Sequence, residues 1–139
     1  MAVIDTAMRT LHLTFGALWT GSVVLFALGV LPSVTDAERL AAVARREVQL
    51  SRLSVLVTFL TGGHLAGTLY TVESLFGSGR GYLVLAMLVL WLVLAGLVEV
   101  GTGRLRDGNV AAGTTLYRAG GAVAVVLLVL GGLLASGVA

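Results

Sequence analysis

Four long runs of apolar residues, separated by segments that hold most of the charged residues, decide what this chain can fold into. Each run is close to the ~20 residues that a helix needs to cross a bilayer. We place these spans at about residues 10–31, 53–73, 81–101 and 119–138. Of the 139 residues, 58% are hydrophobic and only 12% are charged, which is too few polar residues to cover a soluble domain. The sequence therefore predicts an all-α integral membrane protein, a single bundle of four transmembrane helices in a lipid bilayer.

The segment between the first two runs has its own helical pattern. Pro32 should close the first span, because proline fits poorly inside a helix. Thr35 and Glu38 then have the spacing of a capping box, and residues 34–61 contain neither Gly nor Pro. We expect a short amphipathic cytoplasmic helix over about residues 36–50. It would either lie on the membrane surface or continue into span two.

The arginines predict the orientation in the membrane. Seven of them flank the first and third connections: Arg39, Arg45, Arg46, Arg52, Arg104, Arg106 and Arg118. Only Arg9 and Arg80 lie on the other side. Because positively charged residues favour the cytoplasmic side, we expect a multi-pass protein of the cytoplasmic (plasma) membrane with both termini outside. The short connection at residues 74–80 makes spans two and three antiparallel neighbours.

Composition excludes several classes of function. The chain has no cysteine, so it has neither disulfides nor thiolate chemistry. A net charge of +2 is too small to indicate nucleic acid. The first run is too long for a signal peptide and lacks a small-residue cleavage site. No constellation typical of a hydrolase or transferase is present, so we do not expect an enzyme.

Span one carries the first candidate site. Met8 and His12 are four residues apart and share a helix face, and Trp19 continues the same stripe. A thioether beside an imidazole suits copper, Cu(I) in particular. The alternative is that His12 lies in the interfacial region beside an ordinary Met and Trp.

Span two carries the second candidate. His64 falls close to the middle of this span, where an ionisable residue is a functional candidate. Gly63 and Gly67 form a small-xxx-small face, which allows close helix approach or room for a flat ligand. Thr61 and Thr68, one turn to either side, are expected to hydrogen-bond the ring. The alternative is a histidine that only bonds to another helix.

The rise of an α-helix gives the expected depths of the two histidines. At ~1.5 Å per residue, His12 should lie ~13 Å outward of the midplane and His64 ~1–2 Å outward. This separation predicts two stations along a path from outside. The remaining acidic residues of the spans, Glu73 and Glu99, are expected to be interfacial groups that reach water or a neighbouring Arg.

Several short motifs stand out along the first three spans: Leu11-His12-Leu13, Ala17-Leu18-Trp19-Thr20-Gly21, Val30-Leu31-Pro32, Ser51-Arg52-Leu53-Ser54, Leu60-Thr61-Gly62-Gly63 and Phe76-Gly77-Ser78-Gly79-Arg80-Gly81. Together with the long apolar third span, they resemble the family of the copper resistance protein D (CopD). The resemblance covers about Leu11 to Arg104, and the chain looks like a minimal four-helix version. The resemblance implies a polytopic protein that handles or imports copper.

Three functions stay open at this point. The first is copper handling or transport, with Met8, His12 and His64 as ligands. Span one also resembles the membrane-bound protoporphyrinogen oxidase family and other small b-type haem proteins. The second function is therefore haem b binding for electron transfer or haem metabolism, with cofactor-binding residues His64, His12, Gly63, Gly67, Arg9 and Arg80. The third is a structural or accessory subunit whose histidines only pack. Because so few polar residues leave little room for a path through a monomer, we also expect a homo-oligomer or a partner membrane subunit.

Overall fold

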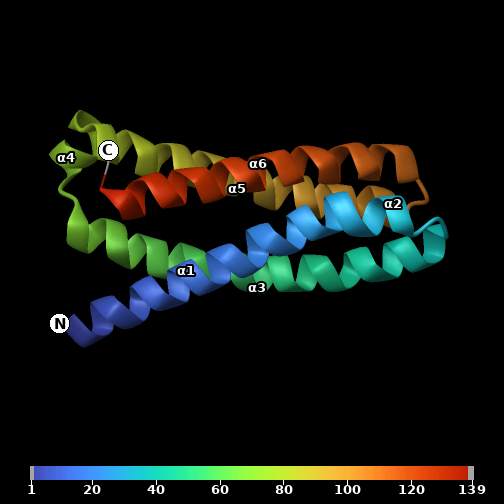
Figure 1. The fold of residues 1–139 in the computed structure, drawn as a ribbon, viewed down its shortest axis with the longest axis horizontal. Helices are drawn as coiled ribbons and strands as arrows, with labels where there is room; N and C mark the ends of the chain where they lie inside the picture. The colour runs from blue at the N-terminus through green and yellow to red at the C-terminus, as the bar shows by residue number, and fades with distance from the viewer. Residues whose placement is uncertain (1, 138–139) are drawn as a thin grey trace.

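Four long helices form the protein in the computed structural model, which describes residues 2–137. The elements are α1 (Ala2–Leu25), the π-helix η1 (Phe26–Val30), α2 (Leu31–Ser33), α3 (Ala37–Leu69), α4 (Val72–Gly77), α5 (Gly79–Arg106) and α6 (Val110–Ser136). No strand occurs among the described residues. Helices α1 and α5 each contact both α3 and α6, so the four long helices close into a ring (Figure 1).

The two ends of the bundle hold different parts of the chain. Both chain termini and α4 lie at one end, which we call the terminal end (Figure 1, left). The connections α2–α3 and α5–α6 lie at the other, which we call the loop end. Helices α3 and α5 are antiparallel neighbours, as predicted from the short connection between them.

Among the described residues, three helices are long and apolar enough to cross a membrane: Val3–Ser33, Gly79–Arg106 and Val110–Ser136. This indicates a multi-pass membrane protein. Helix α3 is long enough but more polar, because Ser54, Thr58, Thr61 and His64 interrupt its apolar run.

The expected short helix after span one is part of a longer element. Residues 36–50 do not form a separate helix, and instead supply the first turns of α3, which continues unbroken for 33 residues. The N-cap is Asp36 rather than Thr35. Its carboxylate accepts a hydrogen bond of 2.7 Å from the backbone N–H of Arg39, which satisfies one of the free donors of the first turn.

Pro32 does not end the first long helix where we expected. The helix continues to Ser33, and the backbone becomes extended only at Val34. A proline inside a helix removes one hydrogen bond and crowds the carbonyl four residues earlier, here that of Leu28. The π-helical turns at Phe26–Val30 widen the helix at this point, which accommodates the ring without breaking the chain direction.

The remaining boundaries shift by several residues. The first helix already includes Ala2, well before the expected start at residue 10. The second ends at Leu69, and the expected loop contains α4, whose capping box pairs Thr71 with Ser74. Glu73 is therefore in the first turn of α4 and not in a span. Val138, the expected end of the fourth span, lies outside the described residues.

The packed core occupies the loop-end half and the middle of the bundle. Its largest buried side chains include Trp19, Phe26, Leu94 and Tyr117. The rings of Phe26 and Tyr117 lie 4.1 Å apart between centroids. Gly101 allows this packing, because a Cβ there would lie 3.1 Å from the Tyr117 ring.

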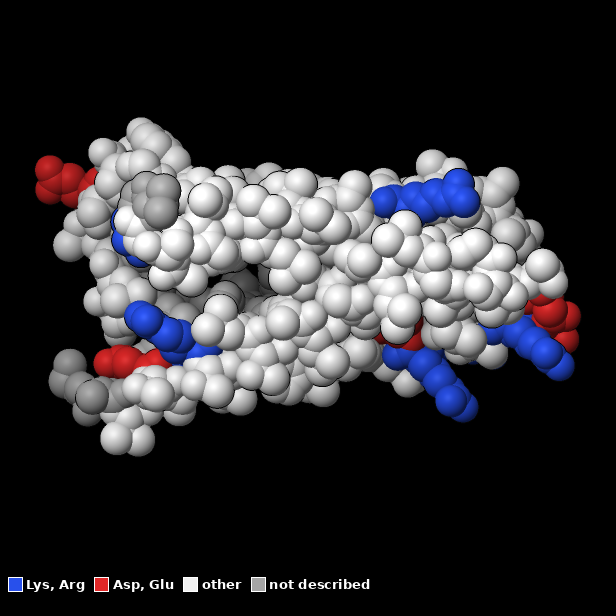
Figure 2. All heavy atoms as spheres, viewed as in Figure 1, with Lys and Arg blue, Asp and Glu red and all other residues white. Residues whose placement is uncertain are grey.

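The terminal half is much more open. No described residue is buried in residues 3–18, 62–80, 82–93 or 128–137. On the face drawn in Figure 2, the surface opens near this end between the α1/α3 pair and the α5/α6 pair. No neighbouring atom lies within 4 Å of a Cβ added at Gly63 or Gly67. The close helix approach predicted for these two glycines is therefore wrong within this bundle.

Candidate functional site

One face of α1 meets α3 in the terminal half and brings together the polar groups of the candidate site. Asp5, Met8 and His12 are spaced three and four residues apart, so they share one side of α1. His12 Nδ1 lies 3.0 Å from Thr61 Oγ1, and His64 Nε2 lies 3.0 Å from Asp5 Oδ1. Both histidines named from the sequence therefore lie at the same α1–α3 contact.

The hydrogen bonds of Thr61 define the tautomer of His12. The Thr61 hydroxyl donates its proton to the carbonyl of Val57 at 2.7 Å, so it accepts from the Nδ1–H of His12. The Nε2 atom of His12 then keeps a lone pair. The close contact of this ring is with Gly62, where a Cβ would lie 2.9 Å from His12 Cε1. Gly62, rather than Gly63 or Gly67, is the glycine on which the site depends.

His64 is oriented by a carboxylate rather than by the threonines of its own helix. Asp5 accepts from its Nε2, which leaves Nδ1 with a lone pair in the neutral ring. Thr61 is paired with His12 instead, and the Thr68 hydroxyl donates to the carbonyl of Leu65. The prediction that Thr61 and Thr68 hold the His64 ring is therefore wrong. Its side chain is 32% exposed, so this site is reachable from outside the bundle.

The order of the two histidines along the bundle is the reverse of our expectation. His12 lies at the level of Thr61, and His64 is three residues nearer the terminal end, about 4.5 Å along the helix. The expected depths were wrong because α1 begins earlier than predicted. The helix already includes Asp5, and it is Asp5, not His12, that lies beside His64. The smaller separation along the axis brings the two rings to neighbouring turns.

Met8 belongs to the same contact by its position on α1. It lies between Asp5 and His12 in sequence and on their common face, and it is partly buried. Asp5 contacts His64 and His12 contacts Thr61. Met8, between them on α1, is therefore level with the turn of α3 from Thr61 to His64. Among the described residues, no group of three or more His, Cys, Asp and Glu is arranged to hold a metal ion.

The two arginines at the terminal end are not part of this contact. Arg9 is exposed on α1. The guanidinium of Arg80 donates to the carbonyl of Leu134 at 3.0 Å, which ties the start of α5 to the end of α6.

A second polar group, which sequence reasoning missed, lies near the loop end. Glu47 is buried, and its carboxylate accepts from the Tyr117 hydroxyl at 3.0 Å and from the Ser22 hydroxyl at 3.3 Å. Tyr117 also hydrogen-bonds Thr102 at 2.7 Å. Glu47 precedes the expected span at 53–73. Burial raises the pKa of its carboxyl, while the hydrogen bonds from Tyr117 and Ser22 act in the opposite direction.

The other acidic residues behave as interfacial groups. Arg52 donates to Glu99 through Nε at 2.6 Å and Nη2 at 2.9 Å, and both side chains are exposed. Glu73 is exposed on α4. These positions agree with the expectation that both carboxylates reach water or an arginine.

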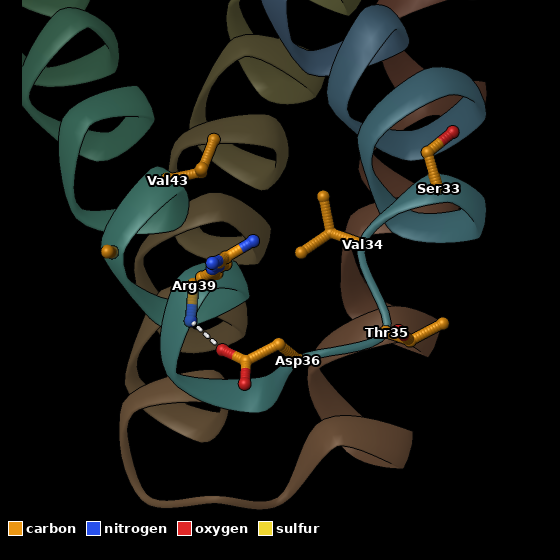
Figure 3. Close-up of a pocket in the computed structure, with 7 residues that line it drawn as sticks. Ser33, Val34, Thr35, Asp36, Arg39 and Val43 are labelled. Atoms are coloured by element: carbon orange, nitrogen blue, oxygen red, sulfur yellow. Dashed lines mark hydrogen bonds between the residues drawn. The ribbon is translucent and has the colours of Figure 1, made fainter.

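A shallow hollow of about 400 Å³ lies at the loop end, far from the histidines (Figure 3). It is lined by the α2–α3 connection and the first turns of α3, with Val34 and Val43 on its walls. The Asp36 cap bond closes one side of it. Its carboxylate, that of Asp36, already caps α3, so we assign the hollow no chemistry.

Comparison with known protein families, with curated proteins and with solved structures finds no match to this chain. The resemblance to the CopD family therefore stays a prediction that rests on the short motifs.

Proposed function

We propose that the protein crosses the plasma membrane four times, with both termini outside, and binds copper at the α1–α3 contact as part of its handling or transport. The observation that carries the metal site is the pairing of each imidazole through one ring nitrogen, to Asp5 for His64 and to Thr61 for His12. Ligating histidines are usually held in this way, by an oxygen on the nitrogen that does not bind the metal. The lone pairs on the other nitrogens are available to an ion.

The ligand set suits copper better than harder ions. Cu(I) is a closed-shell, soft ion that accepts low coordination numbers and favours thioether and imidazole ligands. Met8, His12 and His64 supply one thioether and two imidazoles from two adjacent helices. Copper is here the cargo, held in the terminal half, where the bundle is open on the face shown in Figure 2.

The fourth span in this proposal is the second half of α3. Ser54, Thr58 and Thr61 are buried against the other helices, while apolar side chains face outward, with Leu53, Leu56, Phe59 and Leu60 each more than half exposed. A surface of this kind is suited to lipid and not to water.

The distance along the bundle between charged residues near its two ends also supports four membrane spans. Along α5, Arg80 and Glu99 are 19 residues apart, or about 29 Å at the rise of an α-helix, close to the ~30 Å hydrocarbon core of a bilayer. On the face drawn in Figure 2, charged side chains gather toward the two ends, and the middle carries none. The exposed Gly63/Gly67 face would serve contact with a second copy or a partner subunit.

No described contact favours haem b over copper. In the haem reading, His64 would bind iron through Nδ1, the nitrogen that the contact of Nε2 with Asp5 leaves free, and Arg80 would meet a propionate. The Arg80 guanidinium already donates to the carbonyl of Leu134. A purely structural role for the histidines is the remaining alternative, and it predicts no metal uptake.

The test is a titration of purified protein with Cu(I) against a chromogenic chelator. We expect stoichiometric binding in the wild type, loss of binding in His64→Ala and His12→Ala, and weaker binding in Met8→Leu. Asp5→Asn, which leaves all three ligands in place, should weaken binding about 10–100-fold, as for other groups that orient a ligating histidine.

The matched control is Thr68→Ala, which removes an exposed hydroxyl from the same helix and should change nothing. Unchanged copper content in His64→Ala would contradict the ligand assignment, and a Soret band in the wild type would favour haem. The topology is tested by reporters fused after Ala139. A fusion active only in the cytoplasm would contradict the proposed orientation.

A further inference from the structure

The face of α3 that packs against the other helices is polar in its central part. Glu47, Ser51, Ser54, Thr58 and Thr61 recur at intervals of four and three residues, and each exposes less than a tenth of its surface. This is the spacing of a stripe along one side of a helix. Serine and threonine are common where membrane helices pack, but a buried carboxylate in line with four buried hydroxyls calls for a physical reason.

Two buried groups at the centre of this stripe lack a partner among the described residues, Ser54 Oγ and Trp19 Nε1. Both residues are at least 99% buried. The contacts of Ser22 with Glu47 and of His12 with Thr61 fix the register of α1 against α3, and this register places Trp19 at the level of residues 50–54. An indole N–H and a hydroxyl at one level are the kind of polar partners that hold a buried water molecule.

We propose that this face of α3, from Glu47 to Thr61, binds a chain of water molecules and conducts protons along the bundle axis. Successive members are ~4.5 or 6 Å apart along the helix at 1.5 Å per residue. One water with two hydrogen bonds of about 2.8 Å spans a gap of about 5.6 Å. A single water therefore bridges the steps of ~4.5 Å, and the steps of ~6 Å, from Glu47 to Ser51 and from Ser54 to Thr58, take two. Near the terminal end of the stripe, Trp91 Nε1 donates to Thr58 at 2.9 Å and His12 contacts Thr61 at 3.0 Å.

Each transfer moves one proton and changes no covalent bond of the chain. A proton from water at the loop end neutralises the Glu47 carboxylate. Glu47 then passes this proton to the first water and becomes a carboxylate again. The excess proton moves along the waters and hydroxyls, with the Thr58 and Thr61 hydroxyls turning away from the carbonyls of Ser54 and Val57 to which they otherwise donate. One proton leaves at the level of Thr61 into water of the open terminal half. The path requires no metal, so it does not rest on the copper proposal.

The surroundings of Glu47 suit the role of proton acceptor at the loop end. Ser22 from α1 and Tyr117 from α6 donate to its two oxygens, and Thr102 from α5 hydrogen-bonds Tyr117. Among the described residues no ion pair includes Glu47; Arg52 pairs with Glu99, whose charge also acts on Glu47. The carboxylate therefore has hydrogen-bond donors but no cation of its own, which leaves it free to take up and release a proton.

The experiment measures proton entry into liposomes that contain the full-length protein and an enclosed pH-sensitive dye. A potassium gradient with valinomycin sets the driving potential. The wild type should acidify the lumen faster than protein-free liposomes. Glu47→Gln and Ser54→Ala should reduce the rate to that of protein-free liposomes, and Trp19→Phe, which removes the indole N–H together with the ring that carries it, should reduce it in part.

Glu73→Gln and Thr68→Ala, at exposed positions, are the matched controls and should keep the wild-type rate. Gel filtration establishes that each variant is folded. If Glu47→Gln does not fold, the rate of Ser54→Ala decides the outcome. A wild-type rate equal to that of protein-free liposomes, or wild-type rates in both Glu47→Gln and Ser54→Ala, would overturn the proposal. Copper titration of the same samples keeps this result separate from the metal site.

Discussion

The loop-end half and the terminal half of the bundle are built from the same four helices but packed in different ways. In the loop-end half, Trp19, Leu94 and Tyr117 are each at most 1% exposed, and Gly101 allows α6 to approach α5. In the terminal half, the side chains of Asp5 and His64 are 45% and 32% exposed. The difference shows that one half supplies the stability, which leaves the other free to carry accessible polar groups.

This division has a physical basis in the bilayer. Between helices in lipid, association depends on van der Waals packing and hydrogen bonds rather than on exclusion of water. Tight packing around Leu94, which lies between the levels of Arg80 and Glu99, meets this need. The Phe26–Tyr117 contact lies at the level of Gly101, beyond Glu99, where exclusion of water also contributes. The histidine contact adds two hydrogen bonds but little packing, so it contributes less to holding the bundle closed.

The largest expected effect is a cavity in the packed half. Leu94→Ala should lower the free energy of unfolding by about 2–5 kcal/mol, the range for a buried leucine. Leu88→Ala, on the same helix but in the terminal half and 47% exposed, should cost much less. Unfolding in mixed micelles with increasing denaturing detergent measures both. Equal losses would remove the distinction between the halves.

A bulky residue at a glycine should show the same asymmetry. Gly101→Leu forces a side chain into the Tyr117 ring and should cost about 1–3 kcal/mol, as for overpacked cores. Gly67→Leu meets open space and should leave the thermal unfolding of the monomer in detergent unchanged. A larger loss for Gly67→Leu would show that the terminal half is packed by contacts within the bundle.

The buried carboxyl of Glu47 should make stability depend on pH. Its pKa is raised by burial, so above the ordinary pKa of a glutamate the folded protein retains a proton that the unfolded chain releases. Stability is then fully present below the ordinary pKa and is lost as pH rises toward the raised one, by up to about 1.4 kcal/mol for each pH unit. Glu47→Gln should remove this slope, which unfolding at several pH values measures. If the free energy of unfolding changed with pH in the same way in the wild type and in Glu47→Gln, Glu47 would not be the source of the slope.

The smallest expected effect is the loss of one interhelical hydrogen bond. Thr102→Val removes one of the two hydrogen-bond partners of the Tyr117 hydroxyl and should cost about 0.6 kcal/mol, the average for such contacts in membranes. Thr68→Val, where the hydroxyl bonds only within its own helix, should cost less. If Thr68→Val lowered the free energy of unfolding more than Thr102→Val, hydrogen bonds of the terminal half would contribute more to stability than those of the loop-end half.

How far the site was predictable differs from residue to residue. His12 and His64 were named from the sequence, because ionisable residues are rare in apolar spans and therefore conspicuous. Asp5 was missed because it precedes the first span as we placed it, and Glu47 because it was counted with the charged connection. The signal for Glu47 was present in the four-and-three spacing of Ser51, Ser54 and Thr58 beyond it.

The sequence by itself determined the helical class, the membrane-length apolar runs and the concentration of arginine at one end, because each follows from local composition along the chain. The tertiary structure alone decided that His64 pairs with Asp5, that His12 contacts Gly62 and that Glu47 is buried. A helix has a fixed period, but its rotation and shift against a neighbour depend on how side chains from distant parts of the chain interlock. A shift of one turn exchanges every partner along a helix contact while leaving the pattern of each helix unchanged.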